Sequence, residues 1–345
     1  MLIANRYEPT GNASWGGSGE VNECLDRNLG RKVMLKRVLR PSDYARLLDE
    51  QKALIRLRSK HVVQLLDVVS FRWNETDITC LVLEHIDGSN LEQLTLAPGP
   101  DYQKLLWQIA RGLADIHAAG VIHRDVKPEN IMRDAHGIVK IVDFGLAREI
   151  GKDDKTRSIS GTRGFMAPEL FGTSTISFTK AVDTYAFGRT ALALLGRRPP
   201  SSHVPIPSGT VRAQFPALNS TTADIIEACL DFTATARPAM SSVAHSLAQE
   251  LLRGRHRAQL IQAGTVHELN STKPTLNITS SAGKITIQYD GVRFFVSRVS
   301  GNVFINNQRI STGMAMHSAC VITFGNSSEA RAFLPFDVSN PEIEL

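Results

Sequence analysis

Three short motifs in a fixed order constrain this chain more than any other feature of its sequence. His-Arg-Asp-Val-Lys-Pro-Glu-Asn occupies residues 123–130, Asp-Phe-Gly occupies 143–145, and Ala-Pro-Glu occupies 167–169. Any single Asp or Asn in them is also a common turn or capping residue. The order and the intervals together favour a shared chemical role, because carboxylate and amide oxygens are the ligands that magnesium prefers.

The three motifs resemble the catalytic loop, the metal-binding segment and the end of the activation segment of protein kinases. The resemblance covers roughly residues 5–255. It implies an α+β, bilobal protein kinase fold, with an antiparallel β N-lobe over 1–84 and a mainly helical C-lobe over 85–255. It also implies transfer of the γ-phosphoryl group of ATP to protein substrates, with magnesium as the ion and manganese as an alternative.

The resemblance also implies roles for residues of these motifs. Asp125 would accept or orient the proton of the substrate hydroxyl, while Asn130 and Asp143 would hold the metal. Lys127 would reach the transferred phosphate, as in serine/threonine kinases, so serine or threonine is the expected acceptor and dual specificity stays open.

The segment Ser14–Val21 resembles the glycine loop of kinases, with Ser14 in the place of the first glycine. Glycines let backbone N–H groups approach phosphates without a Cβ in the way. The expected ATP-binding positions in this loop are Gly16, Gly17, Gly19 and Val21. A glycine-rich hairpin without a ligand is the alternative for the segment taken alone.

Val33-Met34-Leu35-Lys36 resembles the kinase strand that carries the phosphate-binding lysine, and Lys36 follows Gly19 by seventeen positions. The resemblance gives Lys36 a catalytic and ATP-binding role on the α- and β-phosphates. A desolvated lysine needs a carboxylate partner. Glu50 is the favoured partner and Asp49 the competing one.

The strand and hinge at the nucleotide base are expected at residues 81–88. By resemblance, the carbonyl of Glu84 and the N–H of Ile86 would pair with adenine. Leu83 would limit the back of the pocket and Met132 would form part of its floor. An ordinary buried strand would have the same composition, so only the register supports this prediction.

The stretch 146–165 is expected to be an activation segment with phosphorylation sites at Thr156, Ser158 and Ser160. A phosphate there would draw in Arg124 and Arg148 through charge-assisted hydrogen bonds, so activation by autophosphorylation is the hypothesis.

Three further residues have structural roles in the family. Glu169 is expected to pair with Arg237, and Asp183 is expected to brace the catalytic loop. The complete docking segment 161–169 argues against phosphotransferases that act on small molecules. The remaining alternatives are a pseudokinase scaffold and a phosphopeptide-binding adaptor.

Hydrophobic periodicity predicts the elements around these motifs. Helices are expected over residues 41–58, 102–118, 182–195 and 222–231, and strands over 62–69 and 78–83. Beyond them, residues 256–274 are polar and basic and read as a linker, with a domain boundary near residue 265.

A small all-β module is expected over residues 275–345. Strands are predicted over 284–288 and 292–296, joined by the turn Tyr289-Asp290-Gly291. Residues 299–310, followed by 321–325, resemble forkhead-associated domains, which bind phosphothreonine peptides. No phosphate-binding arginine is recognisable, so the module is expected to bind either a phosphothreonine peptide or another docking partner.

Composition limits the remaining possibilities. The formal charge of +5 owes much to a basic cluster at 253–257 that reads as a solvated helix end or linker, so nucleic acid is not expected as a partner. The four cysteines are widely spaced and do not form a metal or disulfide pattern. No apolar run approaches the roughly 18–20 residues that cross a bilayer, so no membrane partner and a cytoplasmic, signalling role are expected.

Overall fold

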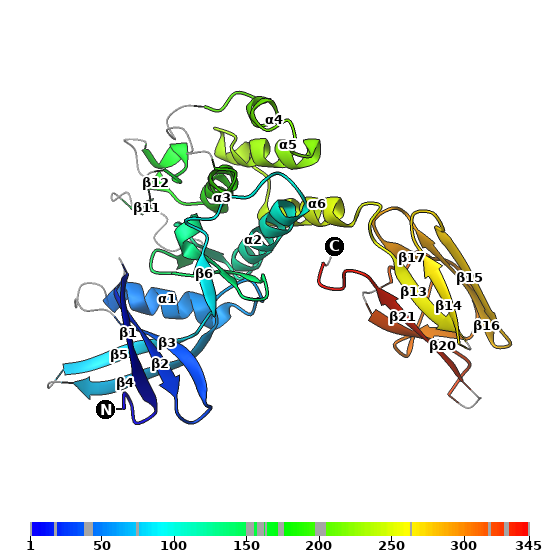
Figure 1. Ribbon diagram of the computed structural model, residues 1–345, viewed down its shortest axis with the longest axis horizontal. Coiled ribbons are helices and arrows are strands. Elements are labelled where there is room, and N and C mark those ends of the chain that lie inside the picture. Colours follow the sequence, from blue (N-terminus) through cyan, green and yellow to red (C-terminus); the bar gives the residue numbers. More distant parts are fainter. Residues whose placement is uncertain are drawn as a thin grey trace. The chain divides into compact units, whose positions relative to one another are not determined.

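The structure is a computed structural model, shown in Figure 1. It describes residues 2–16, 19–37, 44–73, 76–149, 155–156, 162, 164–171, 176–196, 205–262, 264–316, 319–327 and 331–343. Gly17, Ser158 and Ser160, which the sequence singles out, lie outside the described residues. The chain divides into two compact units, Met1–Ala244 and His245–Leu345.

The first unit begins with an antiparallel five-stranded sheet in the order β1-β2-β3-β5-β4. Its strands are Tyr7–Gly16 (β1), Gly19–Asp26 (β2), Arg31–Arg37 (β3), Leu65–Trp73 (β4) and Thr76–Glu84 (β5). The turn between β2 and β3 uses Gly30 at φ 61°, a conformation that glycine adopts at low cost. One helix, α1 (Tyr44–Arg56), accompanies the sheet and confirms the helix expected in this region.

Alternation along β3 separates the two faces of this sheet. Val33 and Leu35 are buried in an apolar cluster with Tyr7, Cys24 and Val82. Lys36 falls on the opposite face because successive side chains of a strand point to opposite sides. The sheet therefore has one face for its own core and one face that presents Lys36.

The rest of the first unit is mainly helical. The helices are α2 (Pro100–Ala118), α3 (Lys180–Leu194), α4 (Thr210–Gln214), α5 (Ser220–Cys229) and α6 (Met240–Leu252), which continues into the second unit. The short strand β6 (Gly88–Asn90) precedes α2. Further short strands lie between α2 and α3: β7 (Val121–Ile122), β8 (Ile131–Asp134), β9 (Val139–Ile141), β10 (Arg148–Glu149), β11 (Lys155–Thr156) and β12 (Ile176–Ser177). Single-turn 3-10 helices cover Pro128–Asn130, Pro168–Phe171 and Ala234–Ala236.

Helices α2 and α3 form the centre of this part. Both are buried along most of their lengths, which is typical of helices that lie inside a large core. The Tyr102 hydroxyl on α2 donates to the Ala191 carbonyl on α3 at 2.9 Å. These two helices, together with α5, confirm the three helices that periodicity predicts after residue 100.

The described residues of the second unit include nine strands in two sheets. They are β13 (Ala258–Gln262), β14 (Thr265–Leu269), β15 (Thr275–Ser280), β16 (Gly283–Tyr289), β17 (Phe294–Gly301), β18 (Val303–Ile305), β19 (Gln308–Arg309), β20 (Ala319–Phe324) and β21 (Ala332–Val338). Their orders are β14-β13-β21-β20-β18-β19 and β15-β16-β17. One apolar cluster, which includes Leu260, Ile287 and Ile322, forms the core.

The structure differs from the linker expected over residues 256–274. Strands β13 and β14 fall within that range, and β13 pairs with β21 at the far end of the chain, so that Ala258 faces Val338. The boundary between the two compact units lies between Ala244 and His245, earlier in the chain than the domain boundary expected near residue 265. In β13 the buried residues Ala258 and Leu260 alternate with exposed ones. This strand pattern is hard to recognise in the sequence because it directly follows a basic cluster.

Among the residues that the structure describes, we find no helix with the length and apolar character that a membrane span requires.

Candidate active site

Lys36 on β3 lies between two carboxylates. Its Nζ is 2.8 Å from Glu50 on α1 and 2.8 Å from Asp143. The side chains of Lys36 and Glu50 are only 5% and 2% exposed, whereas that of Asp143 is 36% exposed. The pairing of Lys36 with Glu50 is therefore as the sequence predicts, while Asp49 instead lies 3.2 Å from Arg148.

Charge and burial set the protonation states in this cluster. Burial would lower the pKa of the Lys36 ammonium, but Glu50 and Asp143 outweigh it and raise the pKa. Burial would raise the pKa of Asp143, but Lys36 and the Gly145 N–H lower it to about 2. At neutral pH the site therefore holds an ammonium group beside an ionised carboxylate.

The catalytic-loop motif is anchored to α3 by one carboxylate. Asp183, which is fully buried, accepts the backbone N–H groups of His123 and Arg124, each at 2.8 Å. His117 Nε2 donates to the same carboxylate at 2.9 Å. Arg124 has φ 72°, a left-handed conformation that is costly for a residue with a Cβ, and the hydrogen bond that its N–H donates to Asp183 helps to hold it. These contacts are the ones that the bracing role predicted for Asp183 requires.

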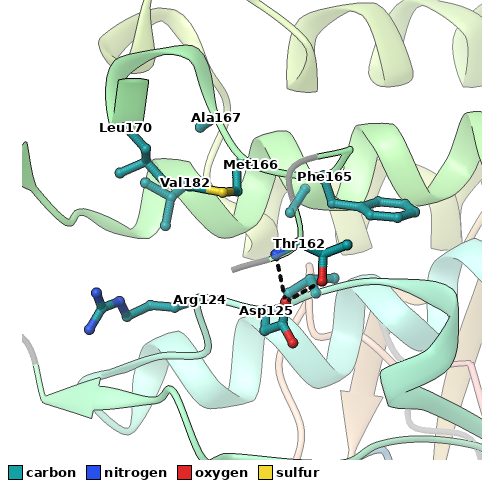
Figure 2. A pocket seen from close by; sticks show the side chains of 10 residues that line it. Arg124, Asp125, Thr162, Phe165, Met166, Ala167, Leu170 and Val182 are labelled. Carbon is teal, nitrogen blue, oxygen red and sulfur yellow. Dashed lines mark hydrogen bonds between the residues drawn. The ribbon is translucent and has the colours of Figure 1, made fainter. Parts of the chain in front are cut away.

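Asp125 lies at the centre of a hydrogen-bond network. Lys127 Nζ is 2.8 Å from Asp125 Oδ2 and donates to Thr162 Oγ1 at 2.7 Å. The Thr162 hydroxyl and N–H also approach Asp125 Oδ1, at 3.1 and 3.3 Å, as the dashed lines in Figure 2 show. Asn130 Nδ2 donates to Asp125 Oδ2 at 2.9 Å. Three side chains and one backbone N–H thus fix the carboxylate of Asp125.

The second acidic motif lies beside the first because β8 and β9 pair. Ile131 faces Ile141 across the two strands, and the Val142 N–H donates to the Asn130 carbonyl at 2.9 Å. Asp143 follows directly and has φ 61°, a conformation that Asp tolerates better than most residues. The Asn130 amide, whose nitrogen is held by Asp125, offers its oxygen as the second hard ligand beside the carboxylate of Asp143. This donor set fits magnesium held jointly with phosphates.

The expected nucleotide-base segment follows β5. Leu83 pairs with Met34, and the Glu84 N–H donates to the Gln64 carbonyl. The Glu84 carboxylate accepts Lys140 Nζ and the Gln64 N–H, each at 2.8 Å. The Glu84 side chain is therefore already engaged by Lys140 and Gln64. The backbone at the end of β5 and just beyond it is the part that would contact a base.

The remaining residues expected in that pocket lie on neighbouring elements. Ile86 and Leu83 are buried, and Met132 lies on β8 opposite Lys140 of β9. In the glycine loop, Gly16 faces Gly19 across β1 and β2, and Val21 faces Lys36 across β2 and β3. The sheet therefore ties the loop to the lysine strand, as the spacing predicts.

The predicted phosphate-sensing arginine, Arg124, is half-buried. The Arg124 guanidinium points away from Asp125 (Figure 2) and lies over the Phe178 ring at 3.5 Å. Burial, together with repulsion from Arg148, lowers the pKa of Arg124 to about 10. Thr156 lies on β11, paired with Ile176, whereas Ser158 and Ser160 lie outside the described residues.

Glu169 and Arg237 form the ion pair that the sequence predicts. Arg237 Nη1 and Nη2 donate to the two carboxylate oxygens, each at 2.8 Å. Arg237 also donates to the carbonyls of Asp231 and Ala181. Its side chain is fully buried, so this pair ties the end of the activation segment to the helical core.

Thr162 is the functional residue that sequence reasoning missed. It lies in the docking segment that the sequence singled out, but only the fold shows that its hydroxyl meets Asp125 and Lys127. A pocket beside it is lined by Asp125, Thr162, Phe165 and Met166, among others (Figure 2). The signal in the sequence was its position five residues before Ala167.

Comparison with known families agrees with this geometry. The protein kinase domain model matches residues 11–257. The chain belongs to the protein kinase domain family. The kinase match covers the five-stranded sheet beyond Thr10 and every helix of the described residues, so the candidate site residues lie within it.

Individual relatives are also kinases. Cyclin-dependent kinase-like 2 of Rattus norvegicus is 36% identical over 205 residues, which are 56% of this chain and 39% of that protein. A probable serine/threonine-protein kinase, pknA2, of Bifidobacterium longum is 32% identical over 221 residues, 60% of this chain and 28% of that protein. G protein-coupled receptor kinase 2 of Drosophila melanogaster is 34% identical over 185 residues, 50% and 25% of the two chains. The chain therefore spans well under half the length of these relatives.

Proposed function

We propose that this chain is a protein serine/threonine kinase that transfers the γ-phosphoryl group of ATP to serine or threonine hydroxyls of proteins. The observation that carries the proposal is the network in which Lys127 and Thr162 hold Asp125 beside Asn130. An aspartate fixed in this way is suited to orient a hydroxyl and take its proton.

Residues around this network would position the nucleotide. Lys36, held by Glu50, would bind the α- and β-phosphates, and the loop with Gly16, Gly17, Gly19 and Val21 would cover them. The backbone of Glu84 and Ile86 would pair with the base between Leu83 and Met132. Asn130 and Asp143 would hold magnesium, which supplies neutralisation of phosphate charge when bound. Most of the catalysis would then come from positioning and charge stabilisation.

Lys127 supports a serine or threonine acceptor. Its ammonium is 2.8 Å from the Asp125 carboxylate, so it lies where a phosphoryl group approaching a hydroxyl at Asp125 would develop charge. The similarity to a probable serine/threonine-protein kinase agrees with this proposal. Residues 1–84 and 85–255 would act as the two lobes around the site.

A transfer assay tests the proposal. Purified chain with magnesium and γ-labelled ATP should label an acceptor protein on serine or threonine, as read by phosphoamino-acid analysis. Asp125→Asn should reduce the rate by about 10²–10⁴-fold. Asp101→Asn, an exposed aspartate in the first turn of α2, is the matched control and should leave the rate unchanged. Label on tyrosine alone, or an undiminished rate in Asp125→Asn, would overturn the proposal.

We also propose that phosphorylation of Thr156, Ser158 or Ser160 activates the enzyme through Arg124 and Arg148. Arg124 is half-buried, and its pKa is lowered by desolvation and by repulsion from Arg148, so a phosphate would relieve that repulsion. Mass spectrometry of active enzyme should find phosphate in this segment, and replacing all three hydroxyl residues by alanine should lower the rate. An unmodified segment in fully active enzyme would refute the idea.

A further inference from the structure

A charged side chain lies in the buried interior around helix α3. Arg189 is 0% exposed, and most other residues of α3 are buried as well. Arginine is almost never fully buried unless it is paired, because removing a charge from water is costly. The contacts of Arg189 should therefore show what its guanidinium is kept for.

Arg189 is hydrogen-bonded to the docking segment. Its Nε donates to the Gly164 carbonyl at 3.0 Å. Gly164 lies inside a turn that the Phe165 N–H closes by donating to the Thr162 carbonyl at 2.8 Å. We call Thr162, Gly164 and Phe165 the docking turn. A side chain of the helical core thus holds the backbone of this turn.

One face of α3 is directed toward the docking turn. Val182, Ala186 and Arg189 recur at helical spacing, so their side chains share a face of the helix. Val182 and Ala186 line the same pocket as Thr162 and Phe165, and all but Ala186 are labelled in Figure 2. Arg189 lies further along this face, so its hydrogen bond extends the contact between α3 and the docking turn.

Two arginines hold the docking segment. Arg237 binds the Glu169 carboxylate at the end of the segment, and Arg189 binds the Gly164 carbonyl nearer its start. The guanidinium carbons of Arg237 and Arg189 lie 4.8 and 5.8 Å from the centre of the Tyr185 ring. A delocalised guanidinium is weakly hydrated and packs readily against an aromatic ring, which lessens the cost of burying Arg189.

Helix α3 thereby holds both partners of the contact between Asp125 and Thr162. Asp183 accepts N–H groups of the catalytic loop that carries Asp125, and Arg189 holds the turn that carries Thr162. The Thr162 hydroxyl and N–H lie 3.1 and 3.3 Å from Asp125 Oδ1. Hydrogen bonds of this length are lost when the turn moves by about 1 Å.

We propose that Arg189 is a positioning residue that serves the acceptor side of the reaction by holding Gly164, and thereby Thr162, in place. The inference rests on the function proposed above, since it concerns how an acceptor protein meets Asp125. Its effect is therefore expected on the acceptor protein and not on ATP, which the cluster around Lys36 would bind. A buried charge that costs stability is a departure from local rules of the kind that proteins keep at functional sites.

Steady-state kinetics of Arg189→Met test the proposal. Methionine is a good helix former and removes every donor of the side chain. We expect kcat/KM for an acceptor protein to fall about 10²-fold, while KM for ATP stays within about twofold of the wild-type value. The thermal midpoint should stay the same or rise, because an apolar side chain in place of a buried charge is often neutral or stabilising.

Thr190→Val is the matched control. Thr190 follows Arg189 on α3 and is fully buried, and its hydroxyl has no hydrogen-bond partner among the described residues. The control should leave both kinetic constants unchanged. Absence of transfer by the wild type would overturn the proposed function and this inference with it. An active wild type whose constants Arg189→Met reproduces would overturn this inference alone.

A double-variant cycle shows whether Arg189 acts through Thr162. Thr162→Val removes the hydroxyl that meets Asp125, so adding Arg189→Met to it should lower kcat/KM by no more than about twofold further. Losses that multiply would show general support of the fold and would overturn the proposal. Arg189→Lys keeps a charged donor and should recover about tenfold of the loss. It replaces Arg189→Met in the cycle should the methionine variant not fold, with the same result expected and the same result overturning the proposal.

Discussion

Replacing Lys36 by methionine removes the only cation that this structure shows bonded to Glu50. Methionine fills a similar volume, so the change isolates the charge. Glu50 is 2% exposed, and an ionised carboxylate left alone in such a place is strongly unfavourable. Breaking a buried pair in this way costs about 3–5 kcal/mol, and we expect that loss in the free energy of unfolding at pH 8.

The cost should depend on pH in a defined direction. The pKa of Glu50 is already raised in the wild type, mainly by burial, and without Lys36 burial and the Asp143 carboxylate raise it further against the Phe144 N–H. The folded variant therefore binds a proton that the unfolded chain releases above about pH 4.3. The stability that this proton contributes is fully present below that pH and is lost as the pH rises through the raised pKa of Glu50. The difference between variant and wild type should therefore shrink by up to about 1.4 kcal/mol for each unit that the pH is lowered from 8.

Urea unfolding followed by tryptophan fluorescence measures this difference. All three tryptophans, at 15, 73 and 107, lie in the first unit, so the signal reports on that unit alone. Lys32→Met is the matched control, since Lys32 lies on the same strand and pairs with Glu23 at 3.2 Å, but its side chain is 57% exposed. It should change stability little and show no such pH dependence.

Two results would refute this reasoning. One is a cost in Lys36→Met that is the same at pH 5 and pH 8, because the charge on Glu50 would then not be its source. The other is a cost no larger than that of Lys32→Met. The variant should also transfer phosphate about 10²–10³-fold more slowly, and a normal rate would contradict the role proposed for Lys36.

Three further predictions concern residues that support the site. Arg237→Met leaves Glu169 and three carbonyls without their donor and should lower unfolding stability by about 3 kcal/mol in urea titrations; a loss under about 1 kcal/mol would contradict the pairing. Asp183→Asn can accept only one of the two loop N–H groups, so it should cost about 2 kcal/mol and lower kcat, and an unchanged kcat would show that the loop does not need it. Burial lowers the pKa of His61, so wild-type stability should fall as pH drops below about 6.5, and His61→Gln should flatten that slope in the same titration.

Much of the catalytic cluster could be predicted from sequence because its chemistry resides in short motifs. Asp125, Asn130 and Asp143 stand close together along the chain, and a short turn and paired strands suffice to bring them side by side. Thr162 could not be assigned in the same way. Its hydroxyl meets an aspartate 37 residues earlier in the chain, and the segment that follows it is tied to the helical core by the Arg237–Glu169 pair, so no local pattern encodes that contact.

In the second unit the sequence predicted a smaller part of the fold than in the first. Alternation predicted the hairpin of β16 and β17 correctly, since one face of each strand is buried. It did not reveal β13, which is five residues long, follows a basic cluster and pairs with a strand near the other end of the chain. A short strand gains most of its stability from its partners, so its own residues carry a weak signal.

The sequence by itself determined the kinase motifs, the helices α1, α2, α3 and α5 of the first unit and the residue types available for phosphoryl transfer, because these depend on neighbours along the chain. Only the tertiary structure decided that Lys36 meets both Glu50 and Asp143, that Thr162 holds Asp125, and that Arg189 meets Gly164. Contacts of that kind join residues far apart in sequence, and they exist only where packing of the whole unit brings distant strands and helices together.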